Sequence, residues 1–114
     1  MSDKITIREA TGTWVVRAGG AVLGETTRAL ALDEDGHATV IYFPRGDIAM
    51  AFLDRTETST HCPKKGDATY YSIVSESTTI RDAAWSYEDP IAQAEGIRGH
   101  LAFHTGDMVA VEEV

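Results

Sequence analysis

Residues 28–43 read RALALDEDGHATVIYF, and this stretch decides the fold class. Residues 28–32 predict one strand, and residues 38–43 predict a strand that returns beside it. Between the two runs, an Asp-Gly pair ends a short acidic loop and signals a tight hairpin turn. Apolar side chains fall on both faces of the second run, because successive residues of a strand point to opposite sides. The stretch therefore predicts an antiparallel hairpin whose second strand lies inside a sheet.

The same pattern recurs along the chain, where turn signals separate short alternating runs. We predict an all-β, mostly antiparallel fold of about eight or nine short strands. Such strands make a compact barrel-like fold or a two-sheet sandwich, because both arrangements hide strand edges. One short helix is predicted near residues 47–53, with Asp47 as its N-cap and with Ile48 and Phe52 on its apolar face.

Length and charge limit the organisation and the partners. The chain has 114 residues and a formal net charge of −8, from 10 basic and 18 acidic side chains. This length predicts a single domain over residues 1–114. The charge argues against nucleic acid and anionic membrane surfaces as partners, because both attract clustered Lys and Arg. The N-terminal residues lack the apolar segment of a secretory signal, and no apolar run could span a membrane, so we expect a cytoplasmic protein.

Residues 61–66, His-Cys-Pro-Lys-Lys-Gly, form a predicted loop that holds the only cysteine of the chain. The thiolate of a cysteine is a nucleophile, and neighbouring cations such as Lys64 and Lys65 favour it. One interpretation is therefore a reactive thiol at Cys62 beside an anion site. The other is a small buried residue, which is the commoner role of a free cysteine. The sequence leaves both interpretations open.

No metal or cofactor site is predicted. His100 and His104 have the spacing of a helical zinc pair, but their segment alternates as a strand, where four residues span about 13 Å. One zinc ion cannot bridge that distance, because its nitrogen ligands lie at about 2.0–2.1 Å. Asp33 and Asp35 lie in the predicted hairpin loop, where Asp is common because it stabilises turns. The glycine spacing of nucleotide-binding loops is missing as well.

Trp85 and Tyr87 share one face of a strand predicted over residues 78–87. Each combines an apolar body with a polar tip, which suits the wall of a ligand pocket. Aromatic side chains also fill hydrophobic cores, and that is their commoner role. The pair therefore predicts either a pocket wall or a part of the core.

Four motifs resemble those of the domain-of-unknown-function 427 family. They are Tyr42-Phe43-Pro44 with Asp47, Cys62-Pro63-x-Lys65-Gly66-x-Ala68-x-Tyr70, Ala84-Trp85-x-Tyr87-x-x-Pro90 and Ile97-x-Gly99-x-x-Ala102-Phe103. The resemblance implies a compact, mostly β, single-domain protein without a known activity. One label of the family mentions nucleotidyl transfer, but no motif in this chain supports that chemistry. Lys64 departs from the family pattern, which has an aromatic or apolar residue there, so a pocket at this loop would be more cationic.

Three functions stay open, and the one we favour is a binding module for a small anionic ligand. Its cleft would lie near loop 62–66, with Lys65 and Arg45 gripping the anion and Trp85 and Tyr87 packing the apolar part.

The second function is an enzyme that uses Cys62 as its nucleophile, with His61 or a distant carboxylate as its base. The third is a structural domain that forms homodimers, because small β domains pair through exposed strand edges. Whether the protein is an enzyme is therefore left open by its sequence.

Overall fold

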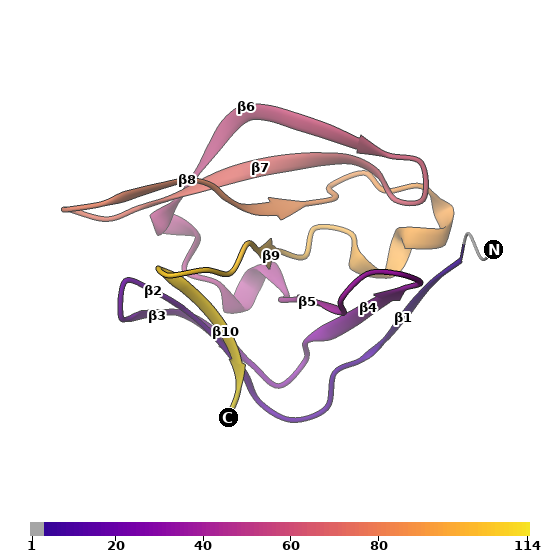
Figure 1. The fold of residues 1–114 in the computed structure, drawn as a ribbon, viewed down its shortest axis with the longest axis horizontal. Helices are drawn as coiled ribbons and strands as arrows, with labels where there is room; N and C mark the ends of the chain where they lie inside the picture. Colours follow the sequence, from indigo (N-terminus) through magenta and orange to yellow (C-terminus); the bar gives the residue numbers. More distant parts are fainter. Residues whose placement is uncertain (1–3) are drawn as a thin grey trace.

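The computed structural model describes residues 4–114. The elements are β1 (Ile5–Glu9), β2 (Trp14–Ala18), β3 (Ala21–Thr26), β4 (Leu30–Glu34), β5 (Val40–Tyr42), β6 (Leu53–Cys62), β7 (Gly66–Val74), β8 (Thr79–Ser86), β9 (Ala102–Phe103) and β10 (Val109–Glu113), with three short 3-10 helices, η1 (Arg45–Asp47), η2 (Met50–Phe52) and η3 (Ala92–Ile97) (Figure 1). Over the described residues, no helix is long and apolar enough to cross a membrane.

The ten strands form three antiparallel sheets, with the orders β1-β4-β5, β10-β2-β3 and β6-β7-β8-β9. Two isolated bridges tie the sheets together. Phe43, after β5, pairs with Leu101, before β9, through backbone hydrogen bonds of 2.8 and 2.9 Å. Gly24 of β3 pairs with Ile48, between η1 and η2. The all-β antiparallel class predicted from the sequence is confirmed, and the three sheets do not close into a barrel.

The helix predicted for residues 47–53 is wrong, because this segment forms two separate 3-10 turns, η1 and η2. Ile48 lies between them in an extended conformation, with φ −109° and ψ 138°. Its backbone pairs with Gly24, and the next N–H, that of Ala49, donates to the carbonyl of Leu23 at 2.8 Å. The carboxylate of Asp47 accepts a hydrogen bond from the hydroxyl of a β3 residue instead of capping a helix. The apolar spacing that predicted a helix therefore reflects the packing of this segment against β3.

Three further segments differ from the sequence expectation. β1 was not predicted, and its alternating isoleucines are only partly buried. Pro90 predicts a loop over residues 88–96, but this segment contains most of η3, whose Ala94 and Ile97 are buried. Alternating residues predict a strand over residues 99–103, but β9 covers only Ala102–Phe103, because the chain is still turning at Gly99.

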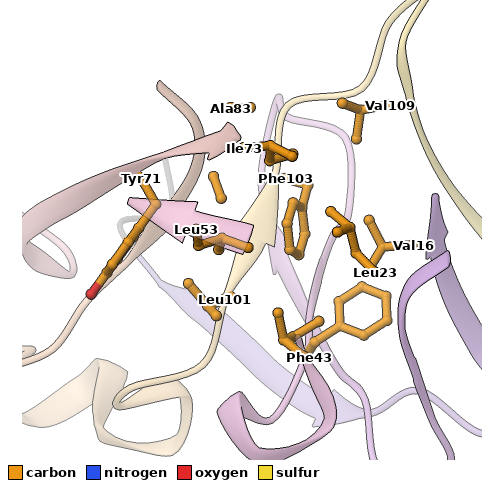
Figure 2. Close-up of a cluster of buried hydrophobic side chains, with 12 residues drawn as sticks. Val16, Leu23, Phe43, Leu53, Tyr71, Ile73, Ala83, Leu101, Phe103 and Val109 are labelled. Carbon is orange, nitrogen blue, oxygen red and sulfur yellow. The ribbon is translucent and has the colours of Figure 1, made fainter. Parts of the chain in front are cut away.

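The main hydrophobic core lies between the β6-β7-β8-β9 sheet and the β10-β2-β3 sheet. Figure 2 shows side chains from both sheets meeting there, with Phe43 and Phe103 in edge contact at a centroid distance of 5.9 Å. A second cluster gathers around Tyr42, Tyr87 and η3. Tyr42 and Phe43 belong to different clusters, because neighbours on an extended chain point to opposite faces. Most candidate site residues lie at the second cluster.

Candidate functional site

Residues 62–66 form a tight hairpin turn. β6 ends at Cys62 and β7 begins at Gly66, and these two residues pair across the turn. The N–H of Lys65 donates to the carbonyl of Cys62 at 3.1 Å. Gly66 has a φ of +114°, and a Cβ there would lie 3.4 Å from the Cα of Pro90. The turn therefore packs closely against the segment after β8, which fixes Cys62 and Lys65 relative to each other.

Lys65 is buried and already ion-paired. Its side chain is 11% exposed, and its Nζ lies 3.1 Å from Oε1 of Glu34. Oε2 of Glu34 accepts a hydrogen bond from Lys64 at 2.8 Å. The hydrogen bond from Lys64, assisted by Lys65, lowers the pKa of Glu34 to about 2, although burial opposes this shift. The sequence predicts that Lys65 binds the anionic group of a ligand. In the structure, the carboxylate of Glu34 already occupies that position.

Cys62 is partly buried, and its Sγ accepts a hydrogen bond from Nζ of Lys65 at 3.4 Å. It packs against the second cluster, which contains Tyr42 and Tyr87. Burial is the main cause that raises the pKa of Tyr42 to about 12, and burial also raises the pKa of Tyr87. The hydroxyl of Tyr42 accepts a hydrogen bond from Nε1 of Trp85 at 3.2 Å. The hydroxyl of Tyr87 has no protein hydrogen-bond partner among residues 4–114, but it is in contact with solvent, because no fully buried side-chain oxygen among these residues lacks a partner.

Arg45 belongs to a different cluster, on the opposite face of β8 from Trp85. Its Nη2 lies 2.8 Å from Oε2 of Glu88 and 3.4 Å from Oγ of Ser86, the residue that follows Trp85. Its guanidinium also lies over the ring of Tyr71, 5.6 Å from the centroid, and the hydroxyl of Tyr71 donates to the same carboxylate. The structure therefore does not bring Arg45 and Lys65 together, and each of them has its own acidic partner.

A groove of about 780 Å³ opens beside Trp85. Its walls include both tryptophans of the chain, Trp14 and Trp85. His104, after β9, packs on Trp85 with ring centroids 4.5 Å apart, and it stacks on Tyr70 at 6.3 Å. Trp85 is the one predicted ligand-binding residue on this wall, because Arg45, Lys65 and Tyr87 face elsewhere.

Two charged groups also line the groove. Arg8, on β1, donates from Nε to Oδ2 of Asp33 at 2.7 Å and from Nη2 to Oδ1 at 3.5 Å. Within residues 4–114, Nη1 of Arg8 has no hydrogen-bond partner. Glu113, at the end of β10, lies against Gly12, where a Cβ would be 2.6 Å from its Oε2. The groove thus combines aromatic walls with one cationic and one acidic group.

Arg8 and Trp14 were not predicted as site residues from the sequence, and His104 was considered only as a metal ligand. These residues come from β1, β2 and the turn after β9, which are far apart in the chain. No motif joins such positions, so only the fold reveals the groove. Among the described residues, no group of three or more His, Cys, Asp or Glu side chains could hold a metal ion.

A family model described as a domain of unknown function, DUF427, matches residues 6–114. A search of curated proteins finds no match to the chain.

Proposed function

Because this chain belongs to the DUF427 family, whose description assigns no activity, we propose its function from its own groove: it is a binding module for a small, flat, anionic ligand. The ligand occupies the groove beside Trp85. The observation that carries this proposal is that both tryptophans and His104 meet at one groove.

The size and lining of the groove suit a small molecule. Its volume of about 780 Å³ falls within the range of about 300–1,000 Å³ that is usual for ligand sites. Trp14, Trp85 and His104 offer flat surfaces, and aromatic rings pack favourably against other flat groups. A nucleobase or an aromatic carboxylate has such a group, whereas a sugar phosphate does not.

The anionic group of the ligand is assigned to Arg8 rather than to Lys65 or Arg45. A guanidinium has five N–H donors, and Asp33 accepts hydrogen bonds from only two of the nitrogens of Arg8. Nη1 can therefore bind a carboxylate or phosphate without displacing Asp33. Lys65 and Arg45 would first have to leave Glu34 and Glu88, which makes them the weaker candidates.

Intrinsic fluorescence tests the proposal directly, because both tryptophans line the groove. The protein is titrated with nucleotides, aromatic carboxylates and sugar phosphates while tryptophan emission and the melting temperature are recorded. We expect saturable quenching and a higher melting temperature with a flat anion, and neither effect with sugar phosphates. If no flat anion changes either signal at millimolar concentration, the proposal is wrong.

Arg8→Met and Arg17→Met form a matched pair of variants. Both arginines lie on strands, are exposed and pair with an acidic residue, but Arg17 is outside the groove. Losing a hydrogen bond to a charged group costs about 1.5–3 kcal/mol, so Arg8→Met should weaken binding about tenfold or more. Arg17→Met should bind as the wild type does. Equal affinities of the two variants would remove Arg8 from the site.

A further inference from the structure

We propose that Cys62 and Lys65 form a peroxide-sensitive pair, in which oxidation of the thiol leads to a covalent sulfur–nitrogen link between the two side chains. This site is independent of the groove. Its basis is the hydrogen bond from Nζ of Lys65 to Sγ of Cys62, at 3.4 Å.

The hairpin turn enforces this contact. Cys62 and Gly66 pair across the strands, and the N–H of Lys65 donates to the carbonyl of Cys62 at 3.1 Å. The carbonyl of Lys65 in turn accepts a hydrogen bond from the N–H of Ile91 at 2.9 Å. Glu34 holds the far end of the Lys65 side chain at 3.1 Å. The amine therefore stays beside the sulfur, and only local side-chain movement is needed to join the two atoms.

The surroundings of the sulfur offer a further polar group. The hydroxyl of Tyr87 has no protein partner among residues 4–114, and it is in contact with solvent, because no fully buried side-chain oxygen among these residues lacks a partner. Cys62 packs against the second cluster, to which Tyr87 belongs, and burial raises the pKa of the Tyr87 hydroxyl, so this hydroxyl stays protonated. A protonated hydroxyl there can donate to an oxygen that is added to the sulfur.

The oxidant is hydrogen peroxide or an organic hydroperoxide. The Cys62 thiolate attacks the terminal peroxide oxygen, the O–O bond breaks and an S–O bond forms, which gives a sulfenic acid and a hydroxide or alkoxide ion. Transfer of the sulfenic proton to that ion leaves a sulfenate together with water or an alcohol. The sulfur loses two electrons and the peroxide gains them. The ammonium of Lys65 then supplies two protons to the sulfenate oxygen, which leaves as water while the nitrogen bonds to sulfur. The products are a neutral sulfenamide and water.

The composition of the chain favours this outcome over a disulfide. Cys62 is the only cysteine, so its sulfenic acid has no thiol partner within the chain. Sulfenic acids condense with nitrogen as well as with thiols. A link to Lys65 would protect the sulfur from irreversible oxidation, and it would release Lys65 from its ion pair with Glu34.

The test oxidises the folded protein with hydrogen peroxide and analyses its peptides by mass spectrometry. We expect the peptide that contains residues 62–65 to lose two hydrogen atoms, to resist tryptic cleavage after Lys65, and to recover on treatment with dithiothreitol. Retention of an unchanged thiol, or conversion to sulfinic acid without the linked peptide, overturns the proposal.

Two variants test whether Lys65 or its neighbour Lys64 forms the link. In Lys65→Met the link cannot form, so dimedone should trap the sulfenic acid; in Lys64→Met, which also removes a partner of Glu34, the link should still form. A sulfur–nitrogen link in Lys65→Met would show that another nitrogen reacts. Loss of the link in Lys64→Met would show that its formation does not depend on Lys65 alone. If Lys65→Met does not fold, the wild-type digest alone decides the matter.

Discussion

Trp85 donates its indole hydrogen to the hydroxyl of Tyr42 at 3.2 Å, while the two rings meet edge to face at 87°. Tyr42 is 1% exposed, so this hydrogen bond anchors a groove-lining indole to the buried second cluster. The orientation of the groove wall thus depends on a residue that no ligand would touch.

Tyr42→Phe removes that anchor. We expect the free energy of unfolding to fall by about 1 kcal/mol, because the indole N–H loses its protein acceptor. Chemical denaturation measures the change. Tyr70→Phe is the control, since within the described part of the chain the Tyr70 hydroxyl bonds only to the exposed Thr60, and its loss should cost less than about 0.5 kcal/mol. Equal losses in the two variants would mean that the Tyr42 bond does not support the indole.

Glu34 links β4 to the hairpin turn, and its pKa of about 2 predicts acid sensitivity. A carboxylate whose pKa is lower in the folded state stabilises the protein above its unfolded pKa, here about 4.5. That contribution falls as the pH drops from about 4.5 to about 2, and it amounts to at most about 3 kcal/mol.

Glu34→Gln should therefore be less stable than the wild type at pH 7, with a difference that shrinks through this acid range. Urea unfolding at several pH values measures it. Glu57→Gln, at an exposed position of β6, should follow the wild type throughout. If the loss of unfolding free energy in Glu34→Gln does not change with pH, the charge of Glu34 is not the cause of the loss.

Asp82 is the one non-glycine residue with a positive φ, 49°, among those described. Its carboxylate accepts hydrogen bonds of 2.7 Å from both Thr56 and Thr58. Asp82→Ala loses both bonds and keeps the unfavourable backbone, so we expect a lower free energy of unfolding than in the wild type. Asp82→Asn tolerates this conformation and keeps one acceptor, so it should lose less than half as much. The urea midpoints rank the variants, and the reverse order would contradict this account.

An exposed apolar surface at one end of the molecule leads us to expect self-association. Val22, Phe52 and Met108 are about half exposed and border a hollow of about 180 Å³ whose lining contains no charged residue. A cavity of about 150 Å³ can hold one benzene ring, so Phe52 of a second copy would fit. Since each copy has a net charge of −8, an uncharged face is where two copies meet with least repulsion.

Sedimentation velocity over a range of concentrations tests this prediction. Phe52→Ser should sediment as a monomer at concentrations where the wild type sediments faster. Ile91→Ser removes an exposed apolar side chain outside this hollow and should behave as the wild type. If both variants match the wild type, copies do not meet at this end.

Local patterns were sufficient for much of the fold. Alternation in residues 38–43 predicted a strand inside a sheet, which is wrong because β5 is an edge strand, although Tyr42 and Phe43 are only 1% and 0% exposed. The reason is not visible in sequence, because β5 lies at the edge of its own sheet and is covered through the Phe43–Leu101 bridge. The helix prediction near Ile48 is wrong for a related reason, since the backbone of Ile48 pairs with that of Gly24, which is distant in the chain.

The candidate site was predictable only in part. The sequence named Trp85 as a ligand-binding candidate, and this residue lines the groove, but the sequence could not show whether a lysine already had a partner. Lys65 meets Glu34, which is 31 positions away, and Arg45 meets Glu88, which is 43 positions away. Charge pairing across such separations depends on strand register, so neither pair leaves a signal in sequence.

The pairing of β10 with β2 has a consequence for synthesis on the ribosome. One side of β2 stays unpaired until residues 109–113 emerge, because only β10 covers it. At about 5–20 residues per second, the intervening chain takes roughly 5–20 s to make. During that interval Val16, which is fully buried in the folded protein, belongs to an open strand edge. We therefore expect the outer edge of β2 to stay open to solvent in nascent chains until residues 109–113 pair with it.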